Sequence, residues 1–320
     1  MSGGEKIAVR VTEKTPLNDL VTRFRFEAVD GRPLPTFSGG AHTVVEMKDG
    51  DRNRLNPYSL MSDPFDRGSY TISVRRDDAG RGGSKFLHSA VDVGDEITIS
   101  YPVNLFSLDL RARKHLMLAG GIGITPFLAQ IKQLDRSHGH WELHYSVRTE
   151  SLGSYVAELT AEHPNDVHVY YDDRGQRIDL DALLRGQPLG THVYVCGPKG
   201  MIDWVHRTAE ARGWPAEAVH SEEFLAPEPG KAFTVELTQA GKTVEVGETE
   251  SLLEALERVG EDPPYLCRGG ACGQCETAVV SADGTILHRD HWLTEEEKAA
   301  GAKIMPCVSR FEGTSLVLDR

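Results

Sequence analysis

Four cysteines near the end of the chain constrain its fold more than any other feature. Cys267, Cys272 and Cys275 follow a C-x4-C-x2-C spacing, and Cys307 supplies a distant fourth thiol. Four thiolates with this spacing surround a plant-type [2Fe–2S] cluster. The loop over 266–275 also holds three glycines and an alanine, which let the backbone turn tightly and direct its N–H groups toward sulfur. The spacing therefore predicts that this part of the chain carries single electrons.

A structural zinc site with four thiolate ligands is the alternative use of such cysteines. Zinc sites of that kind usually pair two C-x2-C knuckles, and an x4 spacing followed by x2 in a glycine-rich loop fits them poorly. We therefore favour the cluster, with Cys267, Cys272, Cys275 and Cys307 as its ligands.

Length and composition limit the class of protein. The 320 residues suffice for two or three domains, and 39% apolar with 26% charged residues is typical of a globular protein. Five cysteines are too few for a disulfide scaffold, and residues 1–10 lack the apolar core of a signal peptide, so we expect a cytoplasmic protein. The chain contains no apolar run of about eighteen residues, so we expect no membrane span.

The net charge of −13 disfavours a nucleic acid as a partner, because no basic surface is implied. From Lys231 onward the chain has sixteen Asp plus Glu against nine Lys plus Arg, a net of −7. An acidic face of this kind is usually only solubilising, yet on an electron-transfer domain it can steer docking to a basic partner.

The pattern of apolar residues divides the chain into three domains, which we place at 1–110, 111–227 and 231–320. Short alternating strands, such as 70–74 and 96–100, predict an antiparallel β-barrel first. Apolar strands that alternate with helices then predict a parallel α/β sheet, with strands at 115–119, 141–147, 167–171 and 191–195 and a helix from Pro126. A linker at 226–230 precedes a hairpin at 233–237 and 243–246 and a helix at 251–259.

The middle domain carries a glycine-rich turn between a strand and a helix. Gly120, Gly121, Gly123, Thr125 and Pro126 lie in this turn, with Thr125 as the expected N-cap and Pro126 in the first helical turn. Such a turn can hold a pyrophosphate at the helix N-terminus, or it can be simply a tight turn.

A second turn of the same sheet strengthens the nucleotide interpretation. Cys196, Gly197 and Pro198 end a later strand, and the carboxyl ends of parallel strands form the ligand crevice. Cys196 is a candidate for the lining of a nicotinamide pocket, although a lone cysteine is more often a small buried residue.

Two segments of the first domain are candidates for binding a flavin. The first is the strand with Asn56, Tyr58, Ser59 and Leu60, beside the strand that ends near Val74. The second comprises Arg81, Gly82, Gly83 and Ser84, where Ser84 is expected to cap a helix whose N-terminus forms an anion site. An ordinary capped helix after a glycine turn explains the second segment equally well.

Taken in order, these motifs resemble the reductases of two-component Rieske oxygenases, typified by phthalate dioxygenase reductase and the reductase of vanillate O-demethylase. The resemblance covers nearly the whole chain and includes the order of domains, with a plant-type ferredoxin domain of α+β (β-grasp) fold last. It implies FMN along Tyr58 and Ser59, with the phosphate near Gly82, Gly83 and Ser84. It also implies that Phe224 lies beside the flavin where the nicotinamide enters, unless Phe224 is a core residue of the middle domain.

One position departs from the family pattern. The family has arginine two residues before the flavin tyrosine, and this chain has Asn56, so Arg54 or Arg81 is a candidate for the missing charge. FMN is favoured over FAD because the sequence shows no adenine-stacking element. NADH is favoured over NADPH because a 2′-phosphate would need a basic pocket after the second strand of this domain. There Arg148 is followed by Glu150, and Asp172 and Asp173 end the next strand, so the surroundings are expected to be mixed or acidic.

The sequence thus predicts an NADH-dependent reductase that passes electrons through FMN and a [2Fe–2S] cluster to a separate Rieske-type oxygenase. Phe224 and Cys196 are its candidate catalytic residues. The alternatives are a stand-alone NADH reductase of another soluble acceptor and a non-catalytic metal-binding protein. The thirteen histidines form no convincing catalytic set, and His140 and His144 are interpreted as structural residues.

Overall fold

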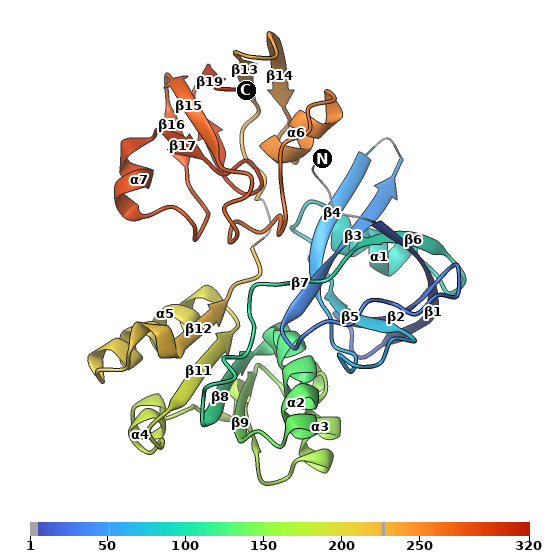
Figure 1. Ribbon diagram of the computed structural model, residues 1–320, viewed down its shortest axis with the longest axis vertical. Helices are drawn as coiled ribbons and strands as arrows, with labels where there is room; N and C mark the ends of the chain where they lie inside the picture. Colours follow the sequence, from blue (N-terminus) through green and yellow to red (C-terminus); the bar gives the residue numbers. More distant parts are fainter. Residues whose placement is uncertain (1–5, 51, 226–227) are drawn as a thin grey trace.

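A computed structural model describes residues 6–50, 52–225 and 228–320 of the chain. Its three large sheets occupy consecutive stretches of sequence and form three lobes around a common centre (Figure 1). The linker predicted at 226–230 lies partly outside the described residues.

The first lobe is a nearly closed antiparallel barrel. Its path runs β4-β3-β6-β1-β2-β5, and β7 pairs with β3. The alternation of apolar and polar residues explains the barrel, because Val9, Val11, Phe24, Phe26 and Ile72 all point into one core that excludes water. The elements are β1 (Lys6–Pro16), β2 (Val21–Ala28), β3 (Ala41–Asp49), β4 (Arg52–Ser59), β5 (Tyr70–Arg75), α1 (Gly83–Ala90), β6 (Glu96–Ser100) and β7 (Val103–Asn104).

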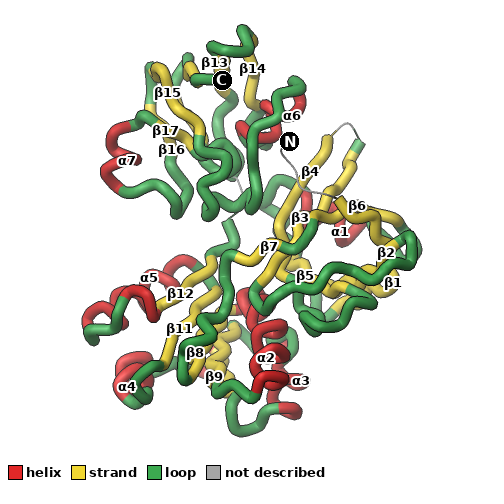
Figure 2. The backbone as a smooth tube through the Cα atoms, viewed as in Figure 1, coloured by secondary structure: helices red, strands yellow, loops and turns green. Residues whose placement is uncertain are grey.

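The second lobe is a parallel sheet in the order β10-β9-β8-β11-β12, with helices on both faces (Figures 1 and 2). The chain adds β9 and β10 on one side of β8 and then crosses over to add β11 and β12 on the other side. The carboxyl ends of β8 and β11 therefore lie side by side, at the place where such sheets bind ligands. The elements are β8 (Lys114–Gly120), α2 (Thr125–Ser137), β9 (Trp141–Val147), α3 (Val156–Glu162), β10 (Val167–Tyr171), α4 (Leu180–Arg185), β11 (Thr191–Cys196), α5 (Lys199–Ala211) and β12 (Val219–Glu222). Short 3-10 turns occupy 121–124, 150–152, 172–174 and 216–218.

The third lobe contains a mixed sheet in the order β14-β13-β19-β15-β17, with β16 and β18 as a separate pair. The sheet packs its apolar face against α6, as Val235, Val244, Leu252, Leu256 and Leu318 share one core. The elements are β13 (Phe233–Leu237), β14 (Lys242–Val246), α6 (Leu252–Arg258), β15 (Thr277–Ala282), β16 (Thr285–Leu287), α7 (Glu295–Ala300), β17 (Lys303–Ile304), β18 (Arg310–Glu312) and β19 (Leu316–Leu318).

The expected fold class is confirmed, and the observed strands follow the predicted ones closely. Two predicted helix caps are wrong. Gly82, with φ +102°, occupies the N-cap position of α1, and the Ser84 hydroxyl accepts a hydrogen bond from the Asp77 N–H at 3.0 Å instead. Thr125 does not cap α2 because a 3-10 turn precedes it, and its hydroxyl donates back to the Ile122 carbonyl at 3.0 Å.

Among the described residues, no helix combines the length and the apolar character that crossing a membrane requires.

Candidate functional site

The main cavity of the described structure lies where the three lobes meet. Its volume is about 780 Å³, and all three lobes contribute to its walls. The barrel supplies Tyr58 and Gly82, the parallel sheet supplies Thr125 and Phe224, and the third lobe supplies Cys267. Candidate residues from distant parts of the sequence therefore face one space.

The four predicted cluster ligands converge at the edge of this cavity. Cys275 Sγ lies 3.3 Å from Cys307 Sγ, while the N–H groups of Gly269 and Ala271 donate to Cys267 Sγ at 3.3 and 3.4 Å. A hydrogen bond from the Cys272 thiol, with these two amides, lowers the pKa of Cys267 well below its ordinary value. Four convergent thiols and amides directed at sulfur are the donor set that a [2Fe–2S] cluster requires.

Arg268 fixes the shape of the cysteine loop. It adopts a left-handed conformation with φ +53°, which is uncommon for a residue with a Cβ. Its buried guanidinium is ion-paired with Glu257 of α6 and lies 3.9 Å from the centre of the Tyr265 ring. Sequence analysis did not single out this residue, because nothing in the cysteine spacing requires an arginine at this position.

The N-terminus of α1 forms one end of the cavity. A Cβ on Gly83 would overlap the side-chain amide of Asn56, so the glycine allows β4 to approach the helix. The guanidinium of Arg54 lies 3.3 Å from the position of a Cβ on Gly82. Because the first amides of a helix have no partners within it, this end combines free N–H donors with a cation.

The predicted flavin strand divides into cavity-lining and core residues. Tyr58 and Ser59 line the cavity, and burial raises the pKa of Tyr58 to about 12, so its hydroxyl is neutral at ordinary pH. The side chains of Leu60 and Val74 instead lie in the barrel core and do not line the cavity. His42 was not predicted; it lines the cavity beside Ser59, and burial lowers its pKa to about 4.

The glycine-rich turn owes most of its glycines to packing. A Cβ on Gly120 would lie 2.7 Å from Pro198 Cδ, and one on Gly123 would overlap the Cys196 carbonyl. A Cβ on Gly197 would in turn crowd the backbone of Gly120. These contacts bring the turn after β8 against the turn after β11. Thr125 lines the cavity, whereas Gly120, Gly121, Gly123, Pro126, Gly197 and Pro198 do not.

Glu222, rather than Cys196, presents a polar side chain to the cavity. Cys196 is fully buried in the sheet core, and burial raises its pKa well above the usual value. Glu222 pairs with Cys196 in the parallel register of β11 and β12 and lines the cavity. Its Oε2 has no hydrogen-bond partner, and burial raises its pKa to about 8. Sequence reasoning missed this carboxyl group because acidic residues are rarely buried.

Phe224 and Leu225, which follow β12, both line the cavity. Phe224 is 47% exposed and lines the cavity, so the interpretation of Phe224 as a core residue is wrong. Leu225 packs against the cluster of buried residues that contains Cys275 and Cys307. Phe224 and Leu225 therefore bring the end of the parallel-sheet lobe against the cysteine loop at the cavity.

Two ion pairs join the third lobe to the others at the cavity. Arg81, predicted to bind a flavin, instead pairs with Glu254 in the first turn of α6, although both residues line the cavity. On the other side, His291 Nε2 lies 2.9 Å from Glu223 Oε2, next to Phe224. Arg54, the other candidate arginine, lies beside Gly82 at the N-terminus of α1.

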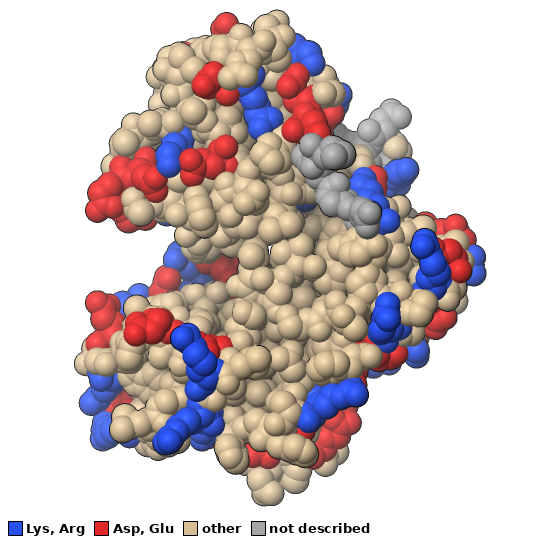
Figure 3. Space-filling view, viewed as in Figure 1, with Lys and Arg blue, Asp and Glu red and all other residues tan. Residues whose placement is uncertain are grey.

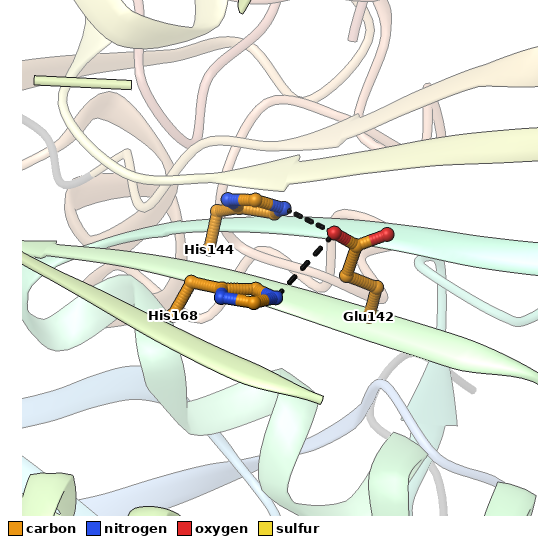
Figure 4. A group of neighbouring side chains, drawn as sticks. All are labelled: Glu142, His144 and His168. Carbon is orange, nitrogen blue, oxygen red and sulfur yellow. Dashed lines mark hydrogen bonds and ion pairs between the residues drawn. The ribbon is translucent and has the colours of Figure 1, made fainter. Parts of the chain in front are cut away.

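A group of titratable residues lies away from the cavity on β9 and β10 (Figure 4). His144 bonds to Tyr170 through Nδ1 and to Glu142 through Nε2, both at 2.9 Å, and His168 Nε2 lies 3.5 Å from the same carboxylate. Lys114 Nζ lies 2.5 Å from the other oxygen of Glu142 and balances its charge. His144 therefore has hydrogen-bond partners on both ring nitrogens, as expected of a structural histidine.

Comparison with known proteins agrees with this arrangement. Residues 235–312 match the model of the 2Fe-2S iron-sulfur cluster binding domain, and residues 85–219 match that of the N-terminal domain of the dimethylamine monooxygenase subunit DmmA-like proteins. The chain is 45% identical to the heme-dependent oxidative N-demethylase beta subunit of Ectopseudomonas mendocina, over 97% of this chain and 98% of that protein. It is 43% identical to the carnitine monooxygenase reductase subunit of Escherichia coli, over the full length of both.

A solved structure resembles the whole molecule. The structure of phthalate dioxygenase reductase, described as modular for electron transfer from pyridine nucleotides to [2Fe-2S], matches with a TM-score of 0.89. The two chains are 34% identical, and the match covers 98% of each. The resemblance inferred from the motifs is therefore confirmed, and the chain belongs to the family of electron-transfer oxidoreductases that includes phthalate dioxygenase reductase and the reductase subunits of multi-component oxygenases.

Proposed function

We propose that the chain takes electrons from NADH and passes them through FMN and a [2Fe–2S] cluster to a separate oxygenase component. One observation carries the proposal: a single cavity is lined by the cysteine loop, by the anion-binding end of α1 and by the nucleotide-type turn of the parallel sheet. The bound cofactors supply the chemistry, since a flavin accepts a hydride and releases electrons singly.

FMN fits the barrel side of the cavity. The N-terminus of α1 and the Arg54 guanidinium suit a terminal phosphate, because helix amides and a cation both favour negative charge. Tyr58 and Ser59 lie on β4, line the same cavity as this end of α1 and Phe224, and offer neutral hydroxyl groups to a ring system. We propose that this strand holds the isoalloxazine.

The nicotinamide side is formed by the parallel sheet. The turn that contains Thr125 and the end of β12 that contains Glu222 face the same space as Phe224. An aromatic ring there excludes water from a flavin and yields its place when a nicotinamide enters. Glu222, which holds its proton at neutral pH, can donate a hydrogen bond to a carboxamide.

The path onward requires the cysteine loop to lie close to the flavin site. Cys267 and Cys307 both line the cavity directly, and Leu225, which also lines it, packs against the buried residues that include Cys275 and Cys307. The proposed flavin site and the cysteine loop thus border the same space.

The acceptor is proposed to be the oxygenase component of a multi-component system, since reductase subunits of such systems match along their full length. A Rieske-type component remains our first candidate. A haem-containing component is the second, because one of the relatives is named as a subunit of a heme-dependent oxidative N-demethylase.

Reconstitution tests this proposal. The purified protein, loaded with FMN and cluster, is combined with NADH and with Rieske-type or haem-containing oxygenase components, and substrate oxidation is measured. We expect product only when both proteins and NADH are present. An intact holoprotein that reduces small acceptors rapidly but no oxygenase component of either kind would favour a stand-alone reductase.

A further inference from the structure

The cluster loop has two sides, and only one of them faces the flavin site. Cys267, Cys307 and Ala271 line the central cavity. Cys272 is the one ligand cysteine that is not fully buried, and neither it nor Gly273 lines that cavity. The cysteine loop is therefore accessible from outside the cavity at Cys272. Electrons that enter from the cavity side could leave on this second side.

A tryptophan covers the loop on this outer side. The indole of Trp292 lies flat against Gly273, where a Cβ would overlap the ring, and 51% of Trp292 is exposed. Its Nε1–H donates to Glu276 Oε2 at 3.0 Å. The neighbouring backbone is also fixed, since the His291 N–H donates to the Gly270 carbonyl at 3.0 Å. Trp292 is thus a rigid apolar group beside a cluster ligand.

Acidic side chains border the tryptophan. Glu295 and Glu296, three and four residues after Trp292, begin α7 and are both exposed, and Figure 3 shows acidic groups gathered over this helix. Counting Glu276, Glu295, Glu296 and Glu297 against Lys298 and Lys303 leaves a local charge of −2 (four acids minus two bases). A basic partner would be attracted to this side of the domain.

We infer that Cys272, Gly273, Gln274, Trp292, Glu295 and Glu296 form the exit face, on which the electron-accepting component docks. The inference rests on the proposed function and names the surface that this function requires. The partner presents an apolar contact for the indole and basic residues around it. Fixed aromatic groups at the centre of an interface contribute most to its affinity, whereas surrounding charges mainly set the rate of encounter and its salt dependence. Each electron that crosses the exit face oxidises the cluster by one electron and reduces one acceptor iron from the ferric to the ferrous state.

Binding of ferricytochrome c, a basic protein with an exposed haem edge, tests the exit face without turnover. Its dissociation constant for the oxidised holoprotein is measured by calorimetry at several salt concentrations. Trp292→Ala should weaken binding by about tenfold, and Trp292→Phe by much less. The double variant Glu295→Gln/Glu296→Gln should weaken binding at low salt and flatten its salt dependence.

Matched controls come from exposed residues of the parallel-sheet lobe. Leu189→Ala removes an apolar side chain that is 90% exposed, and Glu210→Gln/Glu217→Gln removes two exposed charges. Both should bind ferricytochrome c like the unmodified protein. Reduction of the flavin by NADH and of the cluster by the flavin should be unchanged in every variant, and ferricyanide should still be reduced at the normal rate.

Three results would overturn the inference. The first is normal binding by a Trp292→Ala protein with an intact cluster spectrum. The second result concerns the case in which Trp292→Ala loses the cluster. Normal binding of ferricytochrome c by both Trp292→Phe and Glu295→Gln/Glu296→Gln would then contradict the exit face. The third is sedimentation that shows a dimer abolished by Trp292→Ala, which would assign this face to a second copy of the chain. Failure of NADH to reduce the cluster in the unmodified protein would instead contradict the proposed function.

Discussion

Arg81 of the barrel lobe and Glu254 of α6 form an ion pair across the domain boundary, with only 8% and 11% of their side chains exposed. Glu254 also accepts a hydrogen bond from the Ser251 N–H as part of the capping box of α6. The pair therefore connects the anion-binding end of the barrel directly to the helix that supports the cysteine loop.

Removing one partner of this pair should loosen the third lobe. Arg81→Ala leaves a buried carboxylate without its cation, and we expect a loss of about 3 kcal/mol in the free energy of unfolding, with slower electron transfer from flavin to cluster. Glu254→Gln retains a capping-box side chain while removing the charge. Denaturation and stopped-flow spectroscopy measure the two effects. Arg32→Ala, which breaks an exposed pair with Asp30, should change neither the stability nor the rate of electron transfer. A normal rate of electron transfer in Arg81→Ala would contradict the role of the pair between Arg81 and Glu254.

Glu222 should make stability depend on pH in an unusual direction. Burial raises its pKa from 4.5 to about 8, so the folded protein keeps a proton that the unfolded chain has released. Between these values stability should fall as pH rises, by at most about 1.4 kcal/mol per pH unit. Glu222→Gln should remove this slope and slow flavin reduction by NADH. Identical pH profiles of unfolding for the two proteins would show that Glu222 is ionised in the fold.

Phe224→Ala should alter the reaction more than the fold. Because the ring lies half-exposed in the cavity, its removal should cost less than the 3 kcal/mol or so that truncation of a buried phenylalanine costs. We expect changed NADH affinity and a changed rate of hydride transfer, measured by rapid mixing. A large loss of stability with normal flavin reduction would remove Phe224 from the site.

The nucleotide end of the parallel sheet should prefer NADH. Two of its arginines are already paired, Arg174 with Glu150 and Arg177 with Asp172, the latter at 2.7 Å. A 2′-phosphate would have to compete with these carboxylates, so kcat/KM should be at least about tenfold higher for NADH. Glu150→Ala removes the carboxylate paired with Arg174 and should reduce the difference in kcat/KM between NADH and NADPH. An equal or higher kcat/KM for NADPH in the unmodified protein would overturn the preference.

Features that depend on local pattern were predictable from sequence. The strand at 141–147 appears with the predicted bounds because buried alternate residues define it. The convergence of the four cysteines was predictable from their spacing alone. The capping box at Ser251 was not proposed, but the helix predicted at 251–259 is observed over Leu252–Arg258.

Features that depend on distant contacts were not predictable. The partner of Arg81 lies 173 residues away, so the arginine was assigned to a phosphate instead. The strand β12 was missed because His220, Ser221 and Glu222 are polar, although the sheet places them beside β11. The glycines of the turn after β8 match a phosphate-binding motif, but most of them are needed for close packing against residues 196–198.

The most direct test of the account follows the two redox sites after anaerobic mixing with NADH, in the unmodified protein and in Cys272→Ser. The account predicts that the flavin is reduced first and the cluster second, because both sites border one cavity and only the flavin can take a hydride. Cys272→Ser should lose the cluster, keep its flavin and show the first phase alone at the normal rate. Loss of flavin together with the cluster, or reduction of the cluster by NADH in protein without flavin, would contradict it.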